Sequence, residues 1–201
     1  MDARSEFLPQ LRPLIDLIGI EEASLINAAR SNIEIKAHLT DWESTHRAAA
    51  GLADRPPQIL EQEDVFFSVA SGRLKLRTID AGTDRASCEL IYYHRPDLAG
   101  PKQSDFLLLA ISDAVAARQM LEQIHGIRGV VRKKRWLFMH KQTRIHLDRV
   151  EGLGDFLELE VVLAEKQSAE EGQRIALDLA AKLGITPVQL IDCAYIDLLE
   201  R

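Results

Sequence analysis

Two short segments with the same alternation of charged and apolar side chains decide the fold: Asn32-Ile33-Glu34-Ile35-Lys36 and Phe156-Leu157-Glu158-Leu159-Glu160-Val161. Because alternate side chains of a β-strand point to opposite faces, Glu34 and Lys36 share one face of the first strand. For the same reason, Glu158 and Glu160 share one face of the second. The pattern predicts two strands, far apart in the sequence, that each have one charged face and one aliphatic face.

The same two-residue period recurs along the chain and predicts about eight strands in all. They cover residues 32–37, 59–69, 73–79, 87–94, 104–111, 128–139, 143–149 and 156–163. Short turns such as Ser71-Gly72 separate most of them. Short connections imply antiparallel pairing, so the predicted fold class is α+β with an antiparallel sheet.

Helices are predicted at both ends of the chain and in two connections. In residues 1–30, apolar side chains recur at i, i+3 and i+4, with interruptions at Pro13 and Gly19, which predicts two short helices. Further helices are expected from an Asp41 cap to residue 50, from a Ser112 cap to residue 125, over residues 169–183, and from Pro187 to Leu199. We therefore divide the chain into an N-terminal helical extension, residues 1–30, and one domain, residues 31–201.

Composition restricts the class of protein. The chain has 201 residues, of which 46% are hydrophobic and 28% charged, enough for one globular domain with a substantial core. No apolar run approaches the roughly 20 residues that cross a bilayer, and the first four residues are not typical of a signal peptide. A net charge of −6 argues against a nucleic-acid partner. Cys88 and Cys193 lack metal-site spacing, so we expect both thiols to be free in a reducing cytoplasm. Because no apolar run is long enough to cross a bilayer, we expect no membrane partner.

Charges of both signs share one face of the predicted strands, and two arrangements satisfy this pattern. An open sheet would leave the charged face in water, whereas a closed barrel would place it around a cavity for one small ligand. Buried charges then need partners, a ligand or a metal. The cations of this face are Lys36, Arg73, Lys75, Arg77, Arg95, Lys133, Arg135 and Arg144, and the acids are Glu34, Asp64, Glu89, Asp148, Glu158 and Glu160. Arginine suits phosphate and carboxylates suit Mg²⁺ or Mn²⁺, so a closed barrel would favour a polyphosphate–metal site.

Several segments, in this order, resemble the CYTH family, also called triphosphate tunnel metalloenzymes. They are the first strand ending at Lys36, the segment Gly72–Arg77, the basic strand with Lys133 and Arg135, and the acidic strand with Glu158 and Glu160. Two more, residues 89–97 and 148–154, are most similar to the class IV adenylyl cyclase-like branch. The resemblance covers about residues 31–200. It implies a closed eight-stranded antiparallel β-barrel with a polar interior, surrounded by helices.

The resemblance also implies a function. It implies metal-dependent phosphoryl transfer on ATP or another triphosphate, by an adenylyl cyclase-like enzyme (a lyase) or a triphosphatase (a hydrolase). The implied substrate-binding residues are Lys36, Arg73, Lys75, Arg77, Arg95, Lys133, Arg135 and Arg144, with Arg73 and Arg95 at the tunnel mouth. The implied ligands for Mg²⁺ or Mn²⁺ are Glu34, Asp148, Glu158 and Glu160. Lys36, Arg135 and Glu158 are the implied catalytic residues.

One position departs from the family pattern. The family's opening motif is Glu-x-Glu-x-Lys, and here Asn32 stands in place of the first glutamate. An amide oxygen can ligate a divalent ion but brings no charge, so we expect weaker metal binding there. The substitution motivates an alternative function, a module that binds a nucleotide or polyphosphate without turnover.

Two further interpretations concern a histidine and the N-terminal extension. His146 lies among the charges of the same face, and we interpret it as a hydrogen-bonded structural histidine, with a ligand or acid–base role as the alternative. Residues 1–30 lie outside the resemblance. We expect a packing arm there, with a homodimer contact or a lid at one tunnel mouth as alternatives.

Overall fold

The computed structural model describes residues 30–164 and 167–201. The helices predicted within residues 1–30 lie outside the described residues, apart from Arg30 itself, which begins the first strand. In the part of the chain that is described, Cys88 and Cys193 are free, as predicted. Within the same residues, every helix is too short or too polar to cross a bilayer.

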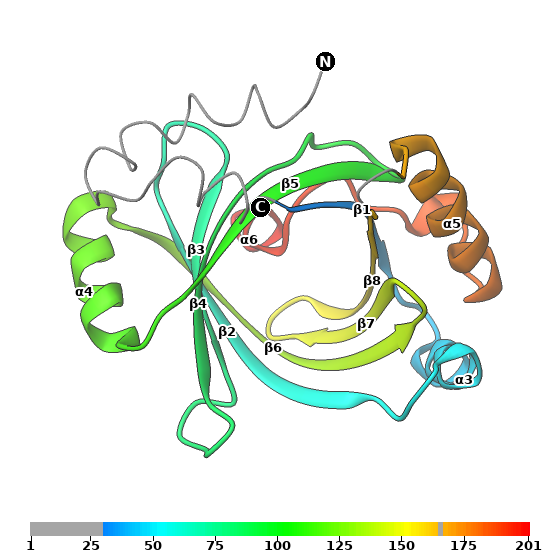
Figure 1. Cartoon of the computed structure of the whole chain (residues 1–201), viewed down its shortest axis with the longest axis horizontal. Helices are drawn as coiled ribbons and strands as arrows, with labels where there is room; N and C mark the ends of the chain where they lie inside the picture. The colour runs from blue at the N-terminus through cyan, green and yellow to red at the C-terminus, as the bar shows by residue number, and fades with distance from the viewer. Residues whose placement is uncertain (1–29, 165–166) are drawn as a thin grey trace.

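Eight strands form a closed antiparallel barrel, which Figure 1 shows nearly end-on. They are β1 (Arg30–His38), β2 (Gln58–Phe67), β3 (Arg73–Ile79), β4 (Ser87–His94), β5 (Lys102–Ala110), β6 (Ile127–His140), β7 (Thr143–Val150) and β8 (Gly154–Val162). Their order around the barrel is β1-β5-β4-β3-β2-β6-β7-β8, and β8 pairs with β1 to close it. Every predicted strand is confirmed, with ends that move by at most two residues. The closed arrangement is the one the protein adopts.

The register brings the charged side chains together inside the barrel. Between β1 and β8, Glu34 lies opposite Glu160 and Lys36 lies opposite Glu158. Between β7 and β8, His146 lies opposite Glu158. Because neighbouring positions alternate between faces, the aliphatic residues of these strands point outward.

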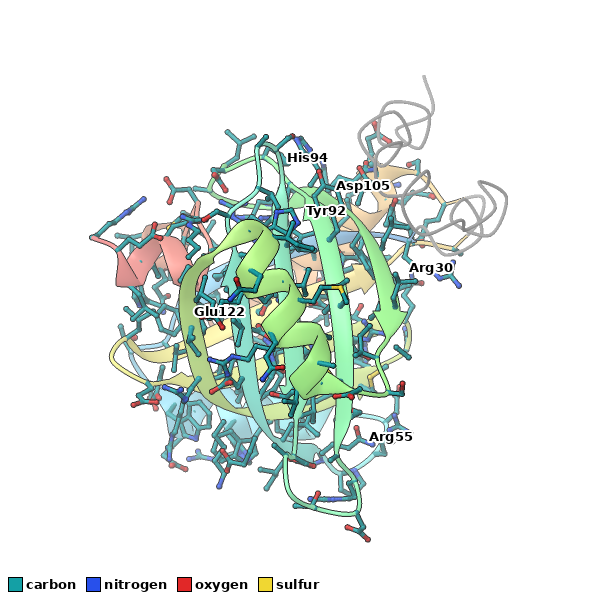
Figure 2. All side chains as sticks on the ribbon, turned by 90° about the vertical axis from the view of Figure 1, so that its left-hand side faces the viewer. Arg30, Arg55, Tyr92, His94, Asp105 and Glu122 are labelled. Atoms are coloured by element: carbon teal, nitrogen blue, oxygen red, sulfur yellow. The ribbon has the colours of Figure 1, made fainter. Side chains whose placement is uncertain are left out.

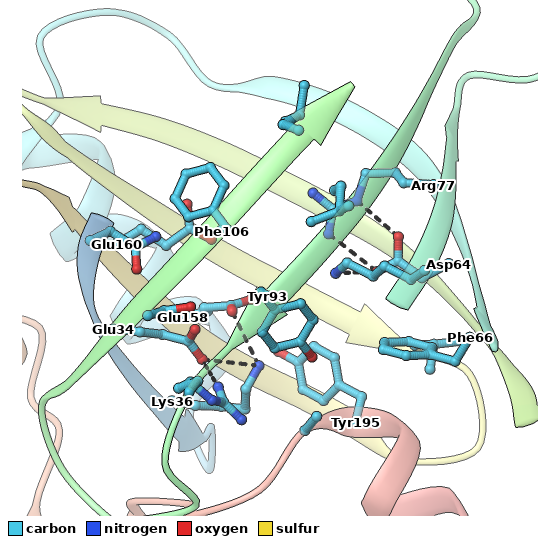
Figure 3. Close-up of a pocket in the computed structure, with 18 of the residues that line it drawn as sticks. Glu34, Lys36, Asp64, Phe66, Arg77, Tyr93, Phe106, Glu158, Glu160 and Tyr195 are labelled. Atoms are coloured by element: carbon cyan, nitrogen blue, oxygen red, sulfur yellow. Dashed lines mark hydrogen bonds and ion pairs between the residues drawn. The ribbon is translucent and has the colours of Figure 1, made fainter. Parts of the chain in front are cut away.

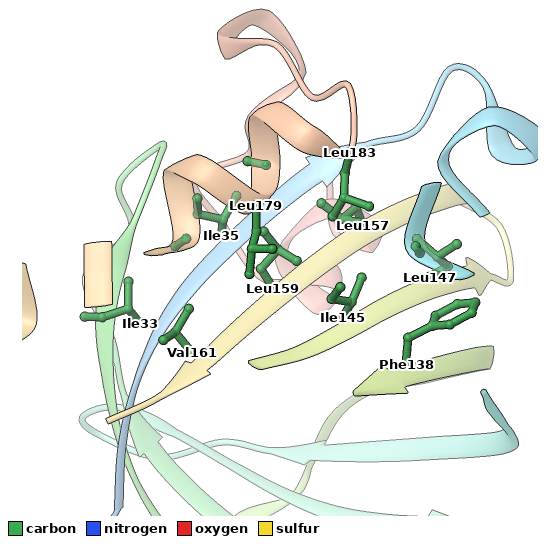
Figure 4. Close-up of a cluster of buried hydrophobic side chains, with 13 residues drawn as sticks. Ile33, Ile35, Phe138, Ile145, Leu147, Leu157, Leu159, Val161, Leu179 and Leu183 are labelled. Atoms are coloured by element: carbon green, nitrogen blue, oxygen red, sulfur yellow. The ribbon is translucent and has the colours of Figure 1, made fainter. Parts of the chain in front are cut away.

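The main hydrophobic core lies outside the barrel, beneath two helices. The apolar outer faces of β1, β7 and β8 pack against α5 (Ala169–Lys182) and α3 (Trp42–Leu52), with Ile33, Ile35, Leu147, Leu157 and Leu159 fully buried (Figure 4). Asp41 caps α3, as predicted, by accepting a hydrogen bond from the amide of Ser44. Burying each of these aliphatic side chains contributes about 1.5–3 kcal/mol, so this layer stabilises the polar barrel from outside.

Helix α4 (Ala114–His125) covers a different part of the barrel. It lies across the outer face of β2 and β3, as Figure 2 shows, over a smaller apolar cluster that includes Val65 and Leu76. The predicted Ser112 cap is wrong, since Asp113 is the N-cap and its carboxylate accepts from the amide of Ala116. A carboxylate at this position also interacts favourably with the positive end of the helix dipole.

The C-terminal segment is not the continuous helix predicted from Pro187 to Leu199. It contains a 3₁₀ turn, η1 (Pro187–Gln189), and a short helix, α6 (Tyr195–Leu199). Between them the backbone bonds to the end of β1: Leu190 bridges Ala37, and the amide of Ile191 donates to the carbonyl of Lys36. These sheet-like bonds replace helical ones, and they hold α6 against one end of the barrel.

Candidate functional site

A polar cavity occupies the interior of the barrel, and all eight strands contribute to its lining. It contains about 760 Å³ of empty space, including its open end. The space within the walls themselves is about 100 Å³, less than the roughly 300–1,000 Å³ typical of small-molecule pockets, so a nucleotide-sized ligand would displace side chains or extend through the open end. Figure 3 shows two groups of charges on opposite sides, one around Asp64 and one around Glu34, Lys36 and Glu158.

The first group surrounds Asp64 with three cations. Its carboxylate accepts from Arg77 Nε at 2.8 Å and from Lys75 Nζ at 3.1 Å, and Lys133 Nζ lies 3.9 Å away. Burial opposes ionisation of Asp64, but Arg77, Lys75 and Lys133 outweigh it and hold its pKa well below the usual range. Burial, followed by repulsion from Arg77, lowers the pKa of Lys75 to about 7. Lys133 Nζ also lies 3.5 Å from Asp148 Oδ2, but Lys75 and Arg77 share Asp64 alone, which leaves a surplus of positive charge on this side of the cavity.

A second network fixes Arg135 beside the cavity. Its guanidinium donates to both oxygens of Asp148, at 2.7 and 2.6 Å, and to Glu158 Oε2 at 2.7 Å. The hydroxyl of Tyr195, from α6, donates to Asp148 at 3.0 Å. Burial opposes ionisation of Asp148, yet Arg135 and Lys133 lower its pKa below the usual range. Since Asp148 is completely buried and fully engaged, it holds Arg135 in place and does not reach the cavity.

The third network closes one end of the cavity. Lys36 Nζ lies 3.2 Å from Glu158 Oε1 and 3.8 Å from the centre of the Tyr195 ring. Arg95 donates to Glu34, and both side chains are buried. These contacts place Tyr195 across the end of the barrel that α6 covers (Figure 3).

An acidic group that includes a histidine lies on the inner face of β7 and β8. His146 Nδ1 lies 4.0 Å from Glu158 Oε2 and 3.9 Å from Glu160 Oε1. Burial and then Arg135 lower the pKa of His146 well below its usual range, so the ring is neutral near pH 7. Burial, followed by the charge of Glu158, raises the pKa of Glu160. Crowded acids of this kind are stabilised by a divalent cation, and oxygen ligands are those that Mg²⁺ and Mn²⁺ prefer.

The remaining wall of the cavity is apolar. Ile91 and Tyr93 from β4 and Phe106 and Leu108 from β5 line it, and Phe66 from β2 adds a further ring. Tyr93 lies two residues before Arg95, so strand alternation places it on the same face. The strand carrying Phe106 and Leu108 reads as a mostly apolar run, and such a run does not indicate which side faces inward. A cavity with a charged side and an aromatic side fits a ligand that has a polyphosphate and an organic group.

Most of the predicted site residues lie around the cavity. Lys36, Lys75, Arg77, Lys133, Arg144, Glu34, Glu158 and Glu160 line it directly. Arg95 was expected at the mouth but lies inside, buried against Glu34. Arg73 lies outside the lining, where it donates to Asp97 and Asp197. No sequence pattern indicated a role for Tyr195, because its segment has the spacing of an ordinary amphipathic helix.

Asn32 and His146 have unsatisfied polar atoms inside the barrel. The side-chain oxygen of Asn32 and Nδ1 of His146 are buried and have no hydrogen-bond partner among the described residues. Nδ1 of His146 therefore makes no hydrogen bond of the kind that a structural histidine would make there, and the structural role stays a prediction. Leaving a buried polar atom unpaired costs about 1–3 kcal/mol, so both atoms indicate a place where a ligand binds. Together with the carboxylates beside them, these donors fit a divalent cation.

Comparison with known proteins agrees with this geometry. The family model described as the CYTH domain matches residues 30–195. The adenylate cyclase CyaB of Aeromonas hydrophila is 26% identical over 179 residues, which cover 86% of this chain and 90% of that protein.

Solved structures share the fold. The PH1012 protein of Pyrococcus horikoshii superimposes with a TM-score of 0.73 at 28% identity, over 83% of this chain and 98% of its own. HpAC1 from Hippeastrum, described as an adenylyl cyclase candidate with a dominant triphosphatase activity, superimposes with a TM-score of 0.61 at 18% identity, over 84% of this chain and 95% of its own.

Proposed function

Because this chain belongs to the CYTH family, we propose that it is a metal-dependent phosphoryl-transfer enzyme that acts on a nucleoside triphosphate or another organic triphosphate. The observation that carries the proposal is the surplus of cations around Asp64 in a barrel cavity with one open end, which also contains a crowded pair of acids. A triphosphate brings the negative charge that these cations lack. Buried cations attract a triphosphate more strongly than exposed ones do, because electrostatic attraction is stronger in a low-dielectric interior.

We assign the phosphate grip to five cations, Lys36, Lys75, Arg77, Lys133 and Arg144. Arg135 holds Glu158 by a hydrogen bond of 2.7 Å and is itself fixed by Asp148, so we assign it to positioning the acidic side of the site. Arg73 ties α6 to the loop after β4 through Asp197 and Asp97, which shapes the closed end of the cavity. In phosphoryl transfer, such positioning and electrostatic stabilisation supply most of the catalysis.

Glu158 and Glu160 are the side chains best placed to hold Mg²⁺ or Mn²⁺, because both line the cavity beside the unpaired Nδ1 of His146. Glu158 also pairs with Lys36 and Arg135, so the ion would share its carboxylate with these cations. When bound, the ion would neutralise charge on the phosphates and orient the nucleophile. Glu34, which we also expected as a ligand, is engaged by Arg95, and Asp148 by Arg135. We therefore assign these two acids to holding arginines in place.

The organic group of the substrate would lie against the apolar wall, where Tyr93 and Phe106 offer aromatic faces. This favours ATP, GTP or thiamine triphosphate over inorganic triphosphate. The relative named adenylate cyclase supports attack by a ribose hydroxyl with release of pyrophosphate. HpAC1 shares the fold and is described as having a dominant triphosphatase activity, which supports the alternative reaction, attack by water with release of phosphate.

A second candidate function is binding without turnover. Asn32 brings a neutral amide where the family motif has a carboxylate, and this substitution reduces the negative charge available to a metal. A cavity that grips triphosphate but holds metal weakly would act as a nucleotide or polyphosphate sensor.

One panel separates these candidates: ATP, GTP, thiamine triphosphate and inorganic triphosphate, each with Mg²⁺ or Mn²⁺, with products resolved by chromatography. Neighbouring lysines of β6 provide a matched pair of variants, because Lys133 points into the cavity and Lys134 points outward to Glu61. We expect Lys133→Met to reduce turnover at least about tenfold, since it removes a buried charge-assisted contact of about 1.5–3 kcal/mol. Lys134→Met should leave turnover unchanged.

The outcomes are distinct. Cyclic nucleotide and pyrophosphate identify the cyclase, and release of phosphate identifies the triphosphatase. Saturable binding of a triphosphate without product favours the sensor. If triphosphates raise the melting temperature of neither the wild type nor Lys134→Met, the cavity is not a triphosphate site and the proposal is wrong.

A further inference from the structure

The inner face of β7 and β8 carries a nitrogen donor beside two carboxylates. His146 and Glu158 are register partners, and Glu160 follows on the same face of β8. One ligand atom of each lies within 4.8 Å of the other two. A nitrogen in this position adds a donor of a different chemical kind to an otherwise acidic site.

The burial of His146 is the independent observation. The side chain is only 3% exposed, and its Nδ1 faces the two glutamates without a hydrogen-bond partner among the described residues. In contrast, His140 on the neighbouring strand β6 pairs its Nδ1 with the carbonyl of Leu52. Buried imidazoles normally find such partners, so the unpaired nitrogen indicates a ligand.

The distances suit one metal ion. In an octahedral site with ligand bonds of about 2.1 Å, neighbouring donors lie about 3.0 Å apart and opposite donors about 4.2 Å apart. The separations of 3.9 and 4.0 Å from His146 to the glutamates lie between these limits. The Glu158 oxygen of this group also accepts from Arg135 at 2.7 Å, so the ion would share that carboxylate with the guanidinium.

We propose that His146 is a direct metal ligand, and that it makes the Glu158–Glu160 site prefer transition-metal ions such as Mn²⁺ or Co²⁺ over Mg²⁺. Imidazole binds first-row transition ions more strongly than it binds Mg²⁺, which prefers oxygen donors alone. The inference rests on the proposed function only in that both place a divalent ion in this cavity. It adds the identity of one ligand and the selectivity that follows.

The first test needs no variant. Mn²⁺ is added to the full-length protein without triphosphate, and pulsed electron paramagnetic resonance records hyperfine coupling to ¹⁴N. A bound imidazole nitrogen gives strong coupling, and we expect that signal in the wild type. Its absence at saturating Mn²⁺ overturns the inference, because it leaves only oxygen ligands.

The second test measures selectivity by calorimetric titration of Mn²⁺, Co²⁺ and Mg²⁺. Loss even of groups that support a metal ligand commonly lowers affinity about 10–100-fold, so His146→Gln should weaken Co²⁺ and Mn²⁺ binding at least about tenfold. Mg²⁺ binding should change less than about threefold, because Gln restores an oxygen donor. His94→Gln, at the exposed end of β4 (Figure 2), is the matched control and should change nothing. Equal losses for all three ions in His146→Gln contradict the selectivity.

These results separate the inference from the proposed function. Coupling to ¹⁴N in a protein that turns over no triphosphate supports His146 as a ligand and removes the enzyme proposal. Turnover of a triphosphate with Mn²⁺ that shows no coupling to ¹⁴N supports the enzyme proposal and removes His146 as a ligand.

Discussion

The sharpest prediction concerns Asp64, the single acid among three cations of the cavity. Asp64→Asn keeps the shape of the side chain and removes its charge. Lys75 and Arg77 then lose the carboxylate that lies 2.8 to 3.1 Å from their nitrogens, and Lys133 keeps only Asp148, 3.5 Å away. We expect the ligand-free protein to be destabilised and triphosphate to restore most of the loss.

The magnitude follows from those distances. At an effective dielectric constant of about 20, each contact is worth about 4–6 kcal/mol of attraction, most of which offsets the desolvation of the charges. Removing one partner of a buried pair commonly costs about 3–5 kcal/mol. For a chain of this length, 1 kcal/mol moves the melting temperature by about 2–4 °C, so Asp64→Asn should lower it by about 6–20 °C.

The assay is thermal unfolding with and without inorganic triphosphate, using chelated, metal-free protein. Triphosphate should raise the melting temperature of Asp64→Asn by more than that of the wild type, because it meets no competing carboxylate in the variant. Asp178→Asn, which removes an exposed ion pair with Lys182 on α5, is the control and should cost less than about 1 kcal/mol.

Two results refute the reasoning separately. A loss below about 1 kcal/mol in Asp64→Asn means that the three cations do not depend on this counterion. Equal stabilisation of variant and wild type by triphosphate means that the phosphates bind elsewhere.

Two further predictions concern stability. The pKa of Lys75 is lowered to about 7 and that of Lys102 to about 8, in both cases by burial and then by a nearby arginine. Between pH 7 and 9.5 the unfolded chain therefore binds more protons than the native one, so the free energy of unfolding in urea should rise with pH, by at most about 1.4 kcal/mol per pH unit for each lysine; a flat or falling profile contradicts this. At Gly172 on α5, an added Cβ would lie 2.6 Å from Ile33 Cγ1, so Gly172→Ala should lower the free energy of unfolding by about 1–2 kcal/mol. Gly51→Ala, with open space around it on α3, should raise it by up to about 1 kcal/mol, and urea melts that reverse this order would refute the packing argument.

Local alternation predicted the strands well because each strand has hydrophobic residues on one face and charged residues on the other, a pattern contained in its own sequence. It did not predict closure. Closure depends on pairing between segments that are distant in the sequence. Strand β1 pairs with β5, where Glu34 lies opposite Lys102, and it also pairs with β8. An open sheet has the same local pattern, and the resemblance to a known family distinguished the two.

Alternation predicted which residues of the candidate site share one face of the strands, but it did not predict how those residues pair. Alternation placed Arg95 and Asp148 on the charged face, yet whether a side chain lines a cavity or locks a neighbour depends on three-dimensional contacts. Arg95 binds Glu34, and Asp148 binds Arg135. His146 is the clearest case, because its unpaired nitrogen results from the register of β7 on β8, which no local pattern records.

The two sides of the cavity have opposite electrostatic needs, and this difference orients any ligand. Around Asp64, three cations share this carboxylate and Asp148 neutralises only Lys133 among them, so the ligand must supply negative charge there. Beside His146, burial and then the charge of Glu158 raise the pKa of Glu160, so a cation bound there would stabilise its ionised form. A triphosphate alone satisfies the first side and a cation alone the second. Because isolated buried charges are costly, the two ligands should bind with positive cooperativity, each removing repulsion that the other cannot.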